Sequence, residues 1–448
     1  MKRYEAYKPT GLNWFSEIPI GWEWRFLSQV AHEQNIKKPV GEMYPVMTLS
    51  YGEIKRKANI DAGLVPSNYD NYQMLYRGNI VLRLIDLQND HTSLRTGLVK
   101  ETGIITSAYT CIAPTENAAY VRYLLHSYDT RKVFYGYGGG VRQSIGYKDI
   151  RHLQVPVPPR EEQDQIVRYL DWQVSKINRL IAAKRKQIEV LKEHRTAKIN
   201  NAVTKGLKDD ASFVKSGYNW LPSIPSNWKP VPAKALFRSI SEFRYADDPM
   251  LAATQKYGLI EQTEYMRLEG RRIVLANDNL DKWLHTEPND FIISLRSFQG
   301  GLEMCNKPGC VTWHYVVLRP QRDVYPNFYK WFFKSAAYIG ALQKTSDFIR
   351  DGQDLRFSNF VKVGLFIITM DEQKEIAAYL DREIPKYDAL IENLEKQIAQ
   401  IAEYRTRLIS DVVTGQIDVR GVEVPEYEVV QDIAEEPEEE TEEMMEEV

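Results

Sequence analysis

The clearest pattern in the chain is an apolar stripe along residues 376–412. Apolar side chains recur there every three or four residues, close to the 3.5-residue repeat of a helix that buries one seam against a partner helix. We predict a long helix whose seam contains Ile376, Leu380, Ile384, Ile391, Leu394, Ile398, Ile401 and Leu408. Pro385 lies inside this stretch and predicts a short helix followed by a long one, because proline suits the first turn of a helix.

The same register occurs 210 residues earlier in the chain. Its apolar members are Ile166, Leu170, Val174, Ile177, Ile181, Ile188 and Leu191, and charged residues occupy three further positions. A helix of about 30 residues spans roughly 45 Å, and its single apolar stripe needs a partner. We predict that the two helices pair with each other, in either direction. The alternative is that each helix packs only on its own domain.

Two other phrases also occur twice. "WFSEIPIGWEW" (Trp14–Trp24) returns as "WLPSIPSNWKP" (Trp220–Pro230), and "EEQDQIVRYLD" (Glu161–Asp171) returns as "DEQKEIAAYLD" (Asp371–Asp381). The whole chain is therefore a doubled unit. It divides into a globular domain (1–158), a helical spacer (159–207), a second globular domain (208–368), a second spacer (369–418) and a tail (419–448).

The globular segments are predicted to be mixed in structure. Runs such as "NIVLRLI", "GIITSAYTCIA", "DFIISLRSF" and "CVTWHYVVLRP" are rich in β-branched and aromatic residues and are bounded by Gly, Asn and Pro, which is typical of short strands. "AAYVRYLLHSYDT" and "PNFYKWFFKSAAYIGALQ" have helical spacing. The fold class is α/β, of the mixed α+β kind, with two globular domains, two long helices and an internal repeat.

Charge and cysteine content narrow the function classes. The net charge is −3, but 13 acidic residues and no Lys or Arg follow from Gly421 onward, so residues 1–420 carry +10. A basic body permits an anionic partner such as nucleic acid, and the acidic tail is predicted to be disordered. Apolar runs such as "VGLFII" are too short to span a membrane, and three cysteines do not make a disulfide framework. We expect a cytoplasmic protein without a membrane partner.

At this point the residues resemble a known family. "IPIGWEWRFLSQVA", followed later by "VPVPPREEQDQIVRYLD", is similar to the specificity subunit of type I restriction–modification systems, over about residues 12–418. The doubled phrases "I-P-x-x-W" and "P-P-x-x-E-Q-x-x-I-x-x-Y-L-D" carry the resemblance. The second copy departs from it, with Ile368 and Thr369 where the first has Pro158 and Pro159.

The resemblance implies an antiparallel coiled coil with a pseudo-two-fold axis that spaces two target-recognition domains. Each domain would read one half of a bipartite site in double-stranded DNA, as part of a host-defence complex. The implied partners are two adenine methyltransferase subunits and restriction (translocase) subunits. S-adenosylmethionine, ATP and Mg are expected only on those partners, and this chain is expected to bind no cofactor.

The residues themselves offer no catalytic constellation. There is no "NPP" or "DPP" clamp for adenine methylation and no Walker "GxxxxGK[ST]". "YGYGGG" (Tyr135–Gly140) opens no βαβ pattern, so we interpret it as a loop near DNA or a plain turn. Cys305, Cys310 and His314 lack a fourth ligand, and we predict no metal site. The chain is therefore predicted not to be an enzyme by itself.

Base reading needs hydrogen-bonding side chains on loops that reach a groove of DNA. The candidates lie after the glycine cluster and in two segments of the second domain: Arg142, Gln143, Ser144, Arg296, Ser297, Gln299, Arg350, Gln353 and Arg356. The competing interpretation of each is an ordinary surface residue or a phosphate contact. The rival function is a coiled-coil scaffold whose globular ends bind other proteins.

Overall fold

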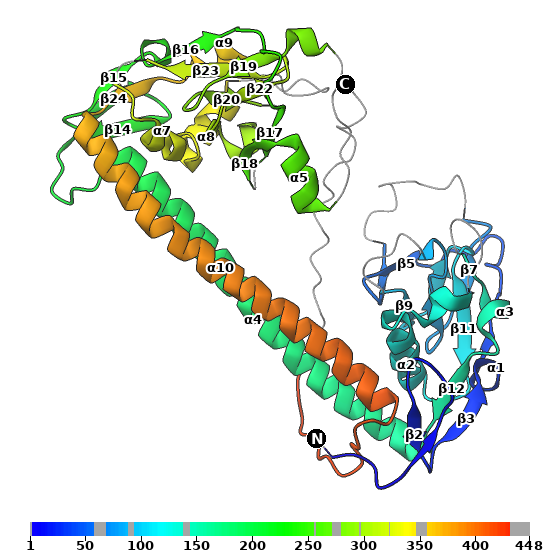
Figure 1. Ribbon diagram of the computed structural model, residues 1–448. Helices are drawn as coiled ribbons and strands as arrows, with labels where there is room; N and C mark the ends of the chain where they lie inside the picture. Colours follow the sequence, from blue (N-terminus) through cyan, green and yellow to red (C-terminus); the bar gives the residue numbers. More distant parts are fainter. Residues whose placement is uncertain are drawn as a thin grey trace. The chain divides into compact units, whose positions relative to one another are not determined.

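The fold is described from a computed structural model of the chain (Figure 1). The described residues are 2–57, 69–87, 94–137, 144–254, 257–270, 279–294, 297–321, 323–345 and 356–430. Within these ranges, no helix is long and apolar enough to cross a membrane.

The chain forms two compact units, each described here by itself. Unit 1 consists of residues 1–185 and 395–435, and unit 2 contains residues 186–394. The helices α4 (Arg160–Lys205) and α10 (Met370–Val413) each contribute one part to either unit. The predicted domains are consecutive segments of the chain, whereas each unit combines separate segments. The predicted boundaries between globular and helical segments stay a prediction.

Unit 1 is built on a four-stranded antiparallel sheet with the order β4-β11-β8-β9. Ile80 pairs with Ile112 and Leu82 with Thr110, and all three residues of β8 are buried. Ile80, Leu82 and Ile112 pack into one core cluster, and Val81 and Cys111 pack into another. The elements are β1 (Tyr7–Pro9), β2 (Glu17–Pro19), β3 (Glu23–Phe26), α1 (Leu27–Val30), β4 (Ala31–Glu33), β5 (Met47–Ser50), β6 (Glu53–Arg56), β7 (Gln73–Leu75), β8 (Ile80–Leu82), β9 (Thr96–Leu98), β10 (Gly103–Ile105), β11 (Thr110–Pro114), α2 (Ala118–Thr130), η2 (Val133–Tyr137), α3 (Tyr147–Ile150) and β12 (Gln154–Val157).

Unit 2 contains a four-stranded antiparallel sheet with the order β16-β23-β20-β21. Phe291 pairs with Leu318 and Ile293 with Val316, and all of β20 is buried. The elements are β13 (Phe213–Tyr218), β14 (Leu221–Pro225), β15 (Lys229–Val231), η3 (Ala233–Ala235), β16 (Phe237–Ile240), β17 (Leu251–Thr254), β18 (Gly258–Glu261), α5 (Gln262–Glu269), η4 (Leu280–Lys282), β19 (Leu284–Thr286), β20 (Phe291–Ile293), α6 (Ser297–Gly300), β21 (Glu303–Met304), β22 (Gly309–Val311), β23 (Val316–Pro320), α7 (Pro326–Phe332), α8 (Ala336–Gln343), α9 (Phe357–Phe360) and β24 (Leu365–Ile367).

The two helical segments predicted from spacing fold differently. In unit 1, α2 is one helix, and the Asn117 side chain caps it by accepting from the N–H groups of Ala119 and Tyr120. In unit 2, the segment divides into α7 and α8, because Ser335 caps a new helix by accepting from the N–H of Tyr338. A serine at this position offers the backbone a partner that competes with helix continuation.

The expectation of a helix restart at Pro385 is wrong. Helix α10 runs without a break from Met370 to Val413 with Pro385 inside it. Proline removes one backbone donor and crowds the preceding turn. Burial of Leu380 and Ile384 in the core of unit 2 keeps the helix intact on the side facing the core. Tertiary packing therefore overrides the local signal.

The long helices contact each other with opposite directions inside each unit (Figure 1). In unit 1, Lys184 Nζ donates to Gln397 Oε1 at 2.5 Å, and Arg405 donates to Asn178 Oδ1 at 2.6 Å. In unit 2, Arg195 pairs with Asp388 at 2.7 Å and Lys198 pairs with Glu383 at 3.6 Å. Residues further along α4 thus meet residues earlier in α10.

The predicted seam residues lie on covered faces of the helices. None of them is exposed, although their use as a continuous seam stays a prediction. The first part of each helix also packs into the core of its unit. The helices therefore contact each other and also pack on globular residues, which are the two alternatives that the sequence left open. The buried members are Ile166, Leu170, Ile177, Ile181, Ile188, Ile376, Leu380, Ile384 and Leu408, and the half-buried members are Val174, Leu191, Ile391, Leu394, Ile398 and Ile401.

The doubled phrases meet at the start of each long helix. Trp22 Nε1 donates to Glu162 Oε1 at 3.1 Å, and Trp228 Nε1 donates to Glu372 Oε1 at 2.9 Å. Both indole rings are almost fully buried. The tryptophan of the first phrase therefore anchors the helix that begins with the second phrase.

A buried glutamine completes this anchor in both units. Gln163 Nε2 donates to the Pro158 carbonyl at 2.9 Å, and Gln373 Nε2 donates to the Ile368 carbonyl at 2.8 Å. Their side-chain oxygens accept from the N–H groups of Asn117 (3.0 Å) and Tyr325 (2.7 Å). Since the acceptor before the helix is a backbone carbonyl, the exchange of proline for isoleucine preserves the contact.

The prediction of a disordered tail is wrong for residues 419–430. Val419 is buried, and Val422 and Val424 pack against the core of unit 1. Apolar side chains spaced through this part of the tail are sufficient to hold it on the protein. Residues 431–448, which hold most of the acidic run, lie outside the described residues.

We predict that Trp22→Phe and Trp228→Phe each destabilise the chain by about 1 kcal/mol, because each removes one hydrogen bond to a carboxylate. Urea unfolding of the full chain measures the loss. Trp313→Phe is the matched control, since Trp313 is 43% exposed. Equal losses in all three variants would contradict the anchoring role of the two buried indoles.

Candidate nucleic-acid interface

Most of the predicted base-reading residues cannot be placed. Arg142, Gln143, Arg296, Arg350 and Gln353 lie outside the described residues, as does the side chain of Gln299. The remaining three candidates are Ser144, Ser297 and Arg356. The hydrogen bonds around them show which elements they lie beside.

Ser144 lies where the chain returns to the sheet of unit 1. Its hydroxyl accepts from the N–H of Asp86 at 3.3 Å, and the N–H of Ile145 donates to the Leu84 carbonyl at 2.9 Å. Residues 83–86 directly follow strand β8. The exposed Ser144 therefore lies beside the turn that follows the carboxyl end of a central strand.

Arg95 shapes this end of the sheet, and sequence reasoning did not identify it. Its guanidinium donates to the carbonyls of Arg83 (3.0 Å), Ile85 (2.7 Å) and Asp86 (2.9 Å), and the side chain is only 6% exposed. One buried cation thus satisfies three carbonyls of the turn that follows β8. The only sequence signal is an arginine beside a strand, which is not specific.

Ser297 is not placed for base contact. Its side chain is fully buried, and its hydroxyl accepts from the N–H of Ser294 at 2.9 Å. It follows strand β20, at the start of the short helix α6, and holds the turn between the two. This turn role suits a serine, whose hydroxyl is a good turn and helix-start group, and the prediction that Ser297 contacts DNA stays a prediction.

Arg356 is exposed at the start of α9, next to the candidate segment 346–355. Asn359 joins the two sides of that segment, because its Nδ2 donates to the Thr345 carbonyl at 2.9 Å and its Oδ1 accepts from the Arg356 N–H at 3.2 Å. Lys362 Nζ also donates to the Thr345 carbonyl at 3.2 Å. The residues on either side of positions 346–355 are therefore joined by hydrogen bonds.

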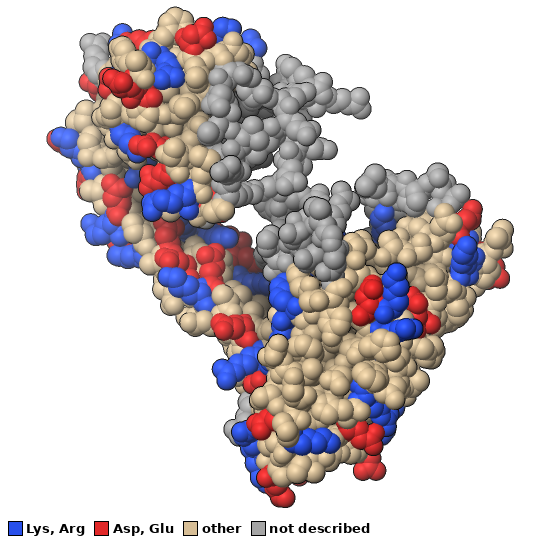
Figure 2. Space-filling model, turned by 45° about the vertical axis from the view of Figure 1, so that its right-hand side comes forward, with Lys and Arg blue, Asp and Glu red and all other residues tan. Residues whose placement is uncertain are grey.

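Charges of both signs are mixed on the face that Figure 2 draws, where Lys and Arg side chains are interspersed with Asp and Glu. Several are paired, as in Arg56 with Glu101 and Lys100 with Glu53 (2.9 Å). Exposed pairs of this kind contribute little to stability but cancel each other's field.

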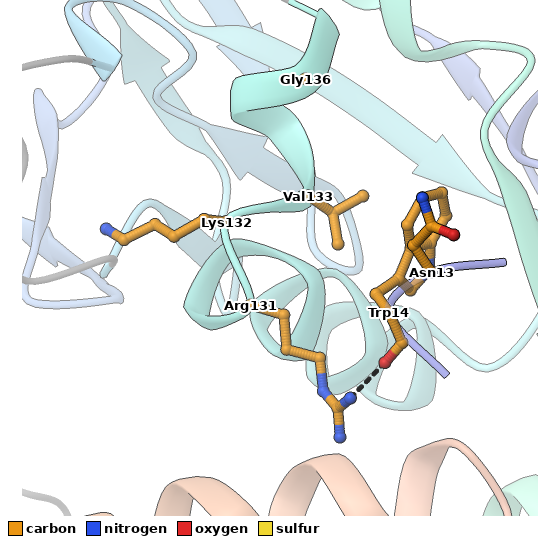
Figure 3. Close-up of a pocket in the computed structure, with 6 residues that line it drawn as sticks. All are labelled: Asn13, Trp14, Arg131, Lys132, Val133 and Gly136. Atoms are coloured by element: carbon orange, nitrogen blue, oxygen red, sulfur yellow. Dashed lines mark hydrogen bonds between the residues drawn. The ribbon is translucent and has the colours of Figure 1, made fainter. Parts of the chain in front are cut away.

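An open pocket of about 500 Å³ lies beside α2 in unit 1 (Figure 3). Arg131 donates to the Trp14 carbonyl, and its Nε donates to Ser410 Oγ at 2.7 Å. Lys132 extends away from them and donates to the Tyr135 hydroxyl at 3.0 Å. Arg131 thus joins the first residues of the chain, α2 and α10, and the pocket borders this joint.

The cysteines are buried thiols. Burial raises the pKa of Cys111 to about 12 and that of Cys310 to about 11, so both stay protonated at neutral pH. Cys305 Sγ donates to the Lys307 carbonyl at 2.8 Å. Among the described residues, no group of three or more His, Cys, Asp or Glu side chains is arranged to hold a metal ion.

A buried histidine in unit 2 lies between two carboxylates. His285 Nδ1 lies 2.8 Å from Asp248 Oδ2, and Nε2 lies 3.1 Å from Glu287 Oε1. Burial lowers the pKa of His285, but the hydrogen bonds to Glu287 and Asp248 outweigh it and leave the pKa raised. The imidazole of His285 thus joins Asp248 to strand β19.

Comparison with known proteins gives consistent matches. The family model for the type I restriction modification DNA specificity domain matches residues 19–190. The provisionally assigned MjaX type I restriction enzyme specificity subunit of Methanocaldococcus jannaschii is 24% identical over 313 residues, which cover 67% of this chain and 68% of that protein. The MjaVIII specificity subunit of the same organism is 25% identical over 299 residues, which cover 62% and 65%.

A solved structure shares the fold. It comes from work on complex assembly and conformational transition of the type I R-M system, and the match has a TM-score of 0.65 over 89% of this chain and 99% of that chain. The sequence identity is 15%, so this likeness concerns the fold alone.

The raised pKa of His285 predicts a pH dependence of stability. A pKa above the ordinary value of about 6.5 gives stabilisation that is fully present below that pH and is lost as pH rises through the folded value. Thermal unfolding of the full chain at increasing pH should show this loss, and His285→Gln should abolish it. His126→Gln is the control, because burial lowers the pKa of His126 to about 3, below the range tested. A slope that survives in His285→Gln would disprove the assignment.

Proposed function

We propose that this type I restriction–modification specificity subunit reads a DNA site in two halves, one with each unit. The observation that carries the proposal is that exposed candidate residues lie at matching places in the two units. Ser144 lies shortly before α3 and β12 in unit 1, and Arg356 lies just before α9 and β24 in unit 2. The central sheets of the two units also have corresponding orders, β4-β11-β8-β9 and β16-β23-β20-β21.

The smaller sheets support the same doubling. The pairs β5-β6, β10-β7 and β12-β3 in unit 1 have the counterparts β17-β18, β19-β22 and β15-β24 in unit 2. Two copies of one fold, related by a pseudo-dyad, would suit duplex DNA, whose backbone has local dyads. Different loop residues at the same edge would let each copy read a different sequence.

In this proposal the long helices form an antiparallel coiled coil that sets the gap between the half-sites. The paired contacts of α4 and α10 in each unit support the antiparallel direction. A helix is stiff over its length, so it suits a spacer better than a flexible linker.

The chain would supply sequence recognition and assembly but no chemistry. Two adenine methyltransferase subunits and the restriction subunits would dock on it, and they would carry S-adenosylmethionine, ATP and Mg. The buried, protonated cysteines support this division, since a thiol needs to ionise to act as a nucleophile.

A domain exchange tests the two-half reading. Replacing residues 14–155 with the equivalent region of a relative should change one half of the methylated motif and leave the other unchanged. Mapping of methylated adenines in cells that carry the chimera with its partners gives the answer. The reciprocal exchange of residues 220–365 is the control. If either exchange altered both halves, the units would not read independently.

An insertion tests the helices as a spacer. Seven residues of matching heptad pattern inserted after Gln187 and again after Gln397 lengthen both helices in register. The gain is roughly 10 Å, which is about three base pairs at about 3.4 Å each. DNA turns by roughly 100° over that length, so affinity should fall while the specified bases stay the same.

The control for this experiment is the insertion after Gln187 alone, which places the two apolar stripes out of register and should abolish assembly or stability. The methylated motif of the doubly lengthened subunit is the measurement. An active double insertion with the original gap between half-sites would show that another feature sets the spacing.

A further inference from the structure

Two side chains of unit 2 converge on the residue that precedes the candidate segment 346–355. Asn359 Nδ2 donates to the Thr345 carbonyl at 2.9 Å, and Lys362 Nζ donates to the same oxygen at 3.2 Å. Asn359 Oδ1 also accepts from the N–H of Arg356 at 3.2 Å, on the other side of the segment. One amide therefore ties together the two residues between which the candidate segment lies.

Both sides of this closure are attached to the core of unit 2. Phe360 in α9 and Leu342 in α8 are fully buried and belong to one hydrophobic cluster. Thr345 is held to the end of α8, because its N–H and its hydroxyl both donate to the Leu342 carbonyl, at 3.0 and 2.7 Å. The closure therefore fixes both ends of the candidate segment to packed elements.

The counterparts in unit 1 lack both donors. At the positions 210 residues earlier, Asp149 stands in place of Asn359, and His152 stands in place of Lys362. Asp149 Oδ2 accepts from the N–H of Gly146 at 2.8 Å, which repeats the helix-start contact of Asn359. A carboxylate only accepts hydrogen bonds, so Asp149 cannot donate to a carbonyl. The ring of His152 is itself an acceptor, from the neighbouring arginine at 3.1 Å.

Unit 1 ties its candidate segment to the sheet instead. Ser144, which follows positions 138–143, accepts through its hydroxyl from the N–H of Asp86 at 3.3 Å. The guanidinium of Arg95 supports the same turn by donating to the Asp86 carbonyl at 2.9 Å. The two candidate segments are thus held by unlike contacts, so a change in the contacts of one unit leaves those of the other intact.

We propose that Asn359 and Lys362 are positioning residues for the half-site that unit 2 reads. The inference rests on the proposed function, in which each unit reads one half of a DNA site. The two residues act through the candidate segment, whose ends they fix before DNA binds. Fixed ends reduce the conformational entropy that the segment loses on binding. They also hold base-contacting side chains to the precision of about 0.5 Å that recognition needs, so the segment does not shift to accept a wrong base.

Methylation of short duplexes by the complex of the full chain with its methyltransferase tests this role. Mapping of methylated adenines first gives the motif, and the exchange of residues 220–365 identifies the half that unit 2 reads. The rate on the motif divided by the rate on a duplex with one changed base gives a discrimination ratio for each half.

The double variant N359D/K362Q removes both donors to the Thr345 carbonyl and keeps an acceptor for the Arg356 N–H. We expect the discrimination ratio for the half read by unit 2 to fall by about tenfold, or about 1.4 kcal/mol, while the ratio for the other half stays the same. K362Q alone changes an exposed residue and should give a smaller fall in the same half.

Two variants serve as controls. D149N makes the converse exchange at the counterpart in unit 1 and should leave both ratios unchanged. Tyr329→Phe removes a buried hydrogen bond to the Phe366 carbonyl (3.1 Å) in unit 2, so it should lower the unfolding temperature without changing either ratio. Unchanged ratios in N359D/K362Q, an equal fall in both halves, or the same fall in Tyr329→Phe would overturn the inference alone. An unmodified complex whose motif is not divided into two halves would overturn the proposed function instead.

Discussion

The structure depends on a buried polar anchor at the start of each long helix. Gln163 and Gln373 are fully buried, and each joins its helix to the residues just before it and to the segment that leads into α2 or α7. A buried amide left without partners is costly, so the helix can leave its unit at only one place. Trp22 and Trp228 add a second contact to the neighbouring glutamates. Any spacer function of the helices requires such a fixed origin.

Equivalent positions in the two copies have diverged where only one copy has a task. Asn178 and Asp388 both hold an arginine of the opposite helix, yet only the amide can also donate to a carbonyl. Doubling thus supplies two scaffolds with the same strand order, and single substitutions then give each scaffold its own contacts. The hydrogen-bonding groups at each position explain this difference, and the general similarity of the halves does not.

Several features could be predicted because their physical cause is local in the chain. The apolar periodicity located both long helices, since a stripe of seam residues requires burial on one side. Short runs of β-branched residues located β8, β11, β20 and β23. Other predictions failed where local signals competed with packing. Pro385 suggested a restart, but the core around Leu380 and Ile384 holds one helix. Acidic composition suggested disorder from residue 419, but a few valines and three α4 side chains hold residues 419–430 on the protein.

The sequence by itself determined the doubled order of globular and helical segments, the family resemblance and the absence of catalytic motifs, because each is written in neighbouring residues and their spacing. Only the tertiary structure decided that Arg95 supports the turn after β8 and that Ser297 faces inward. It also decided that Gln165, Ser175 and Asn178 bind residues 419–430. These roles depend on which backbone groups arrive beside a side chain from distant parts of the chain. A polar residue has the same letter whether it meets DNA, solvent or a buried carbonyl, and folding selects which of these it meets.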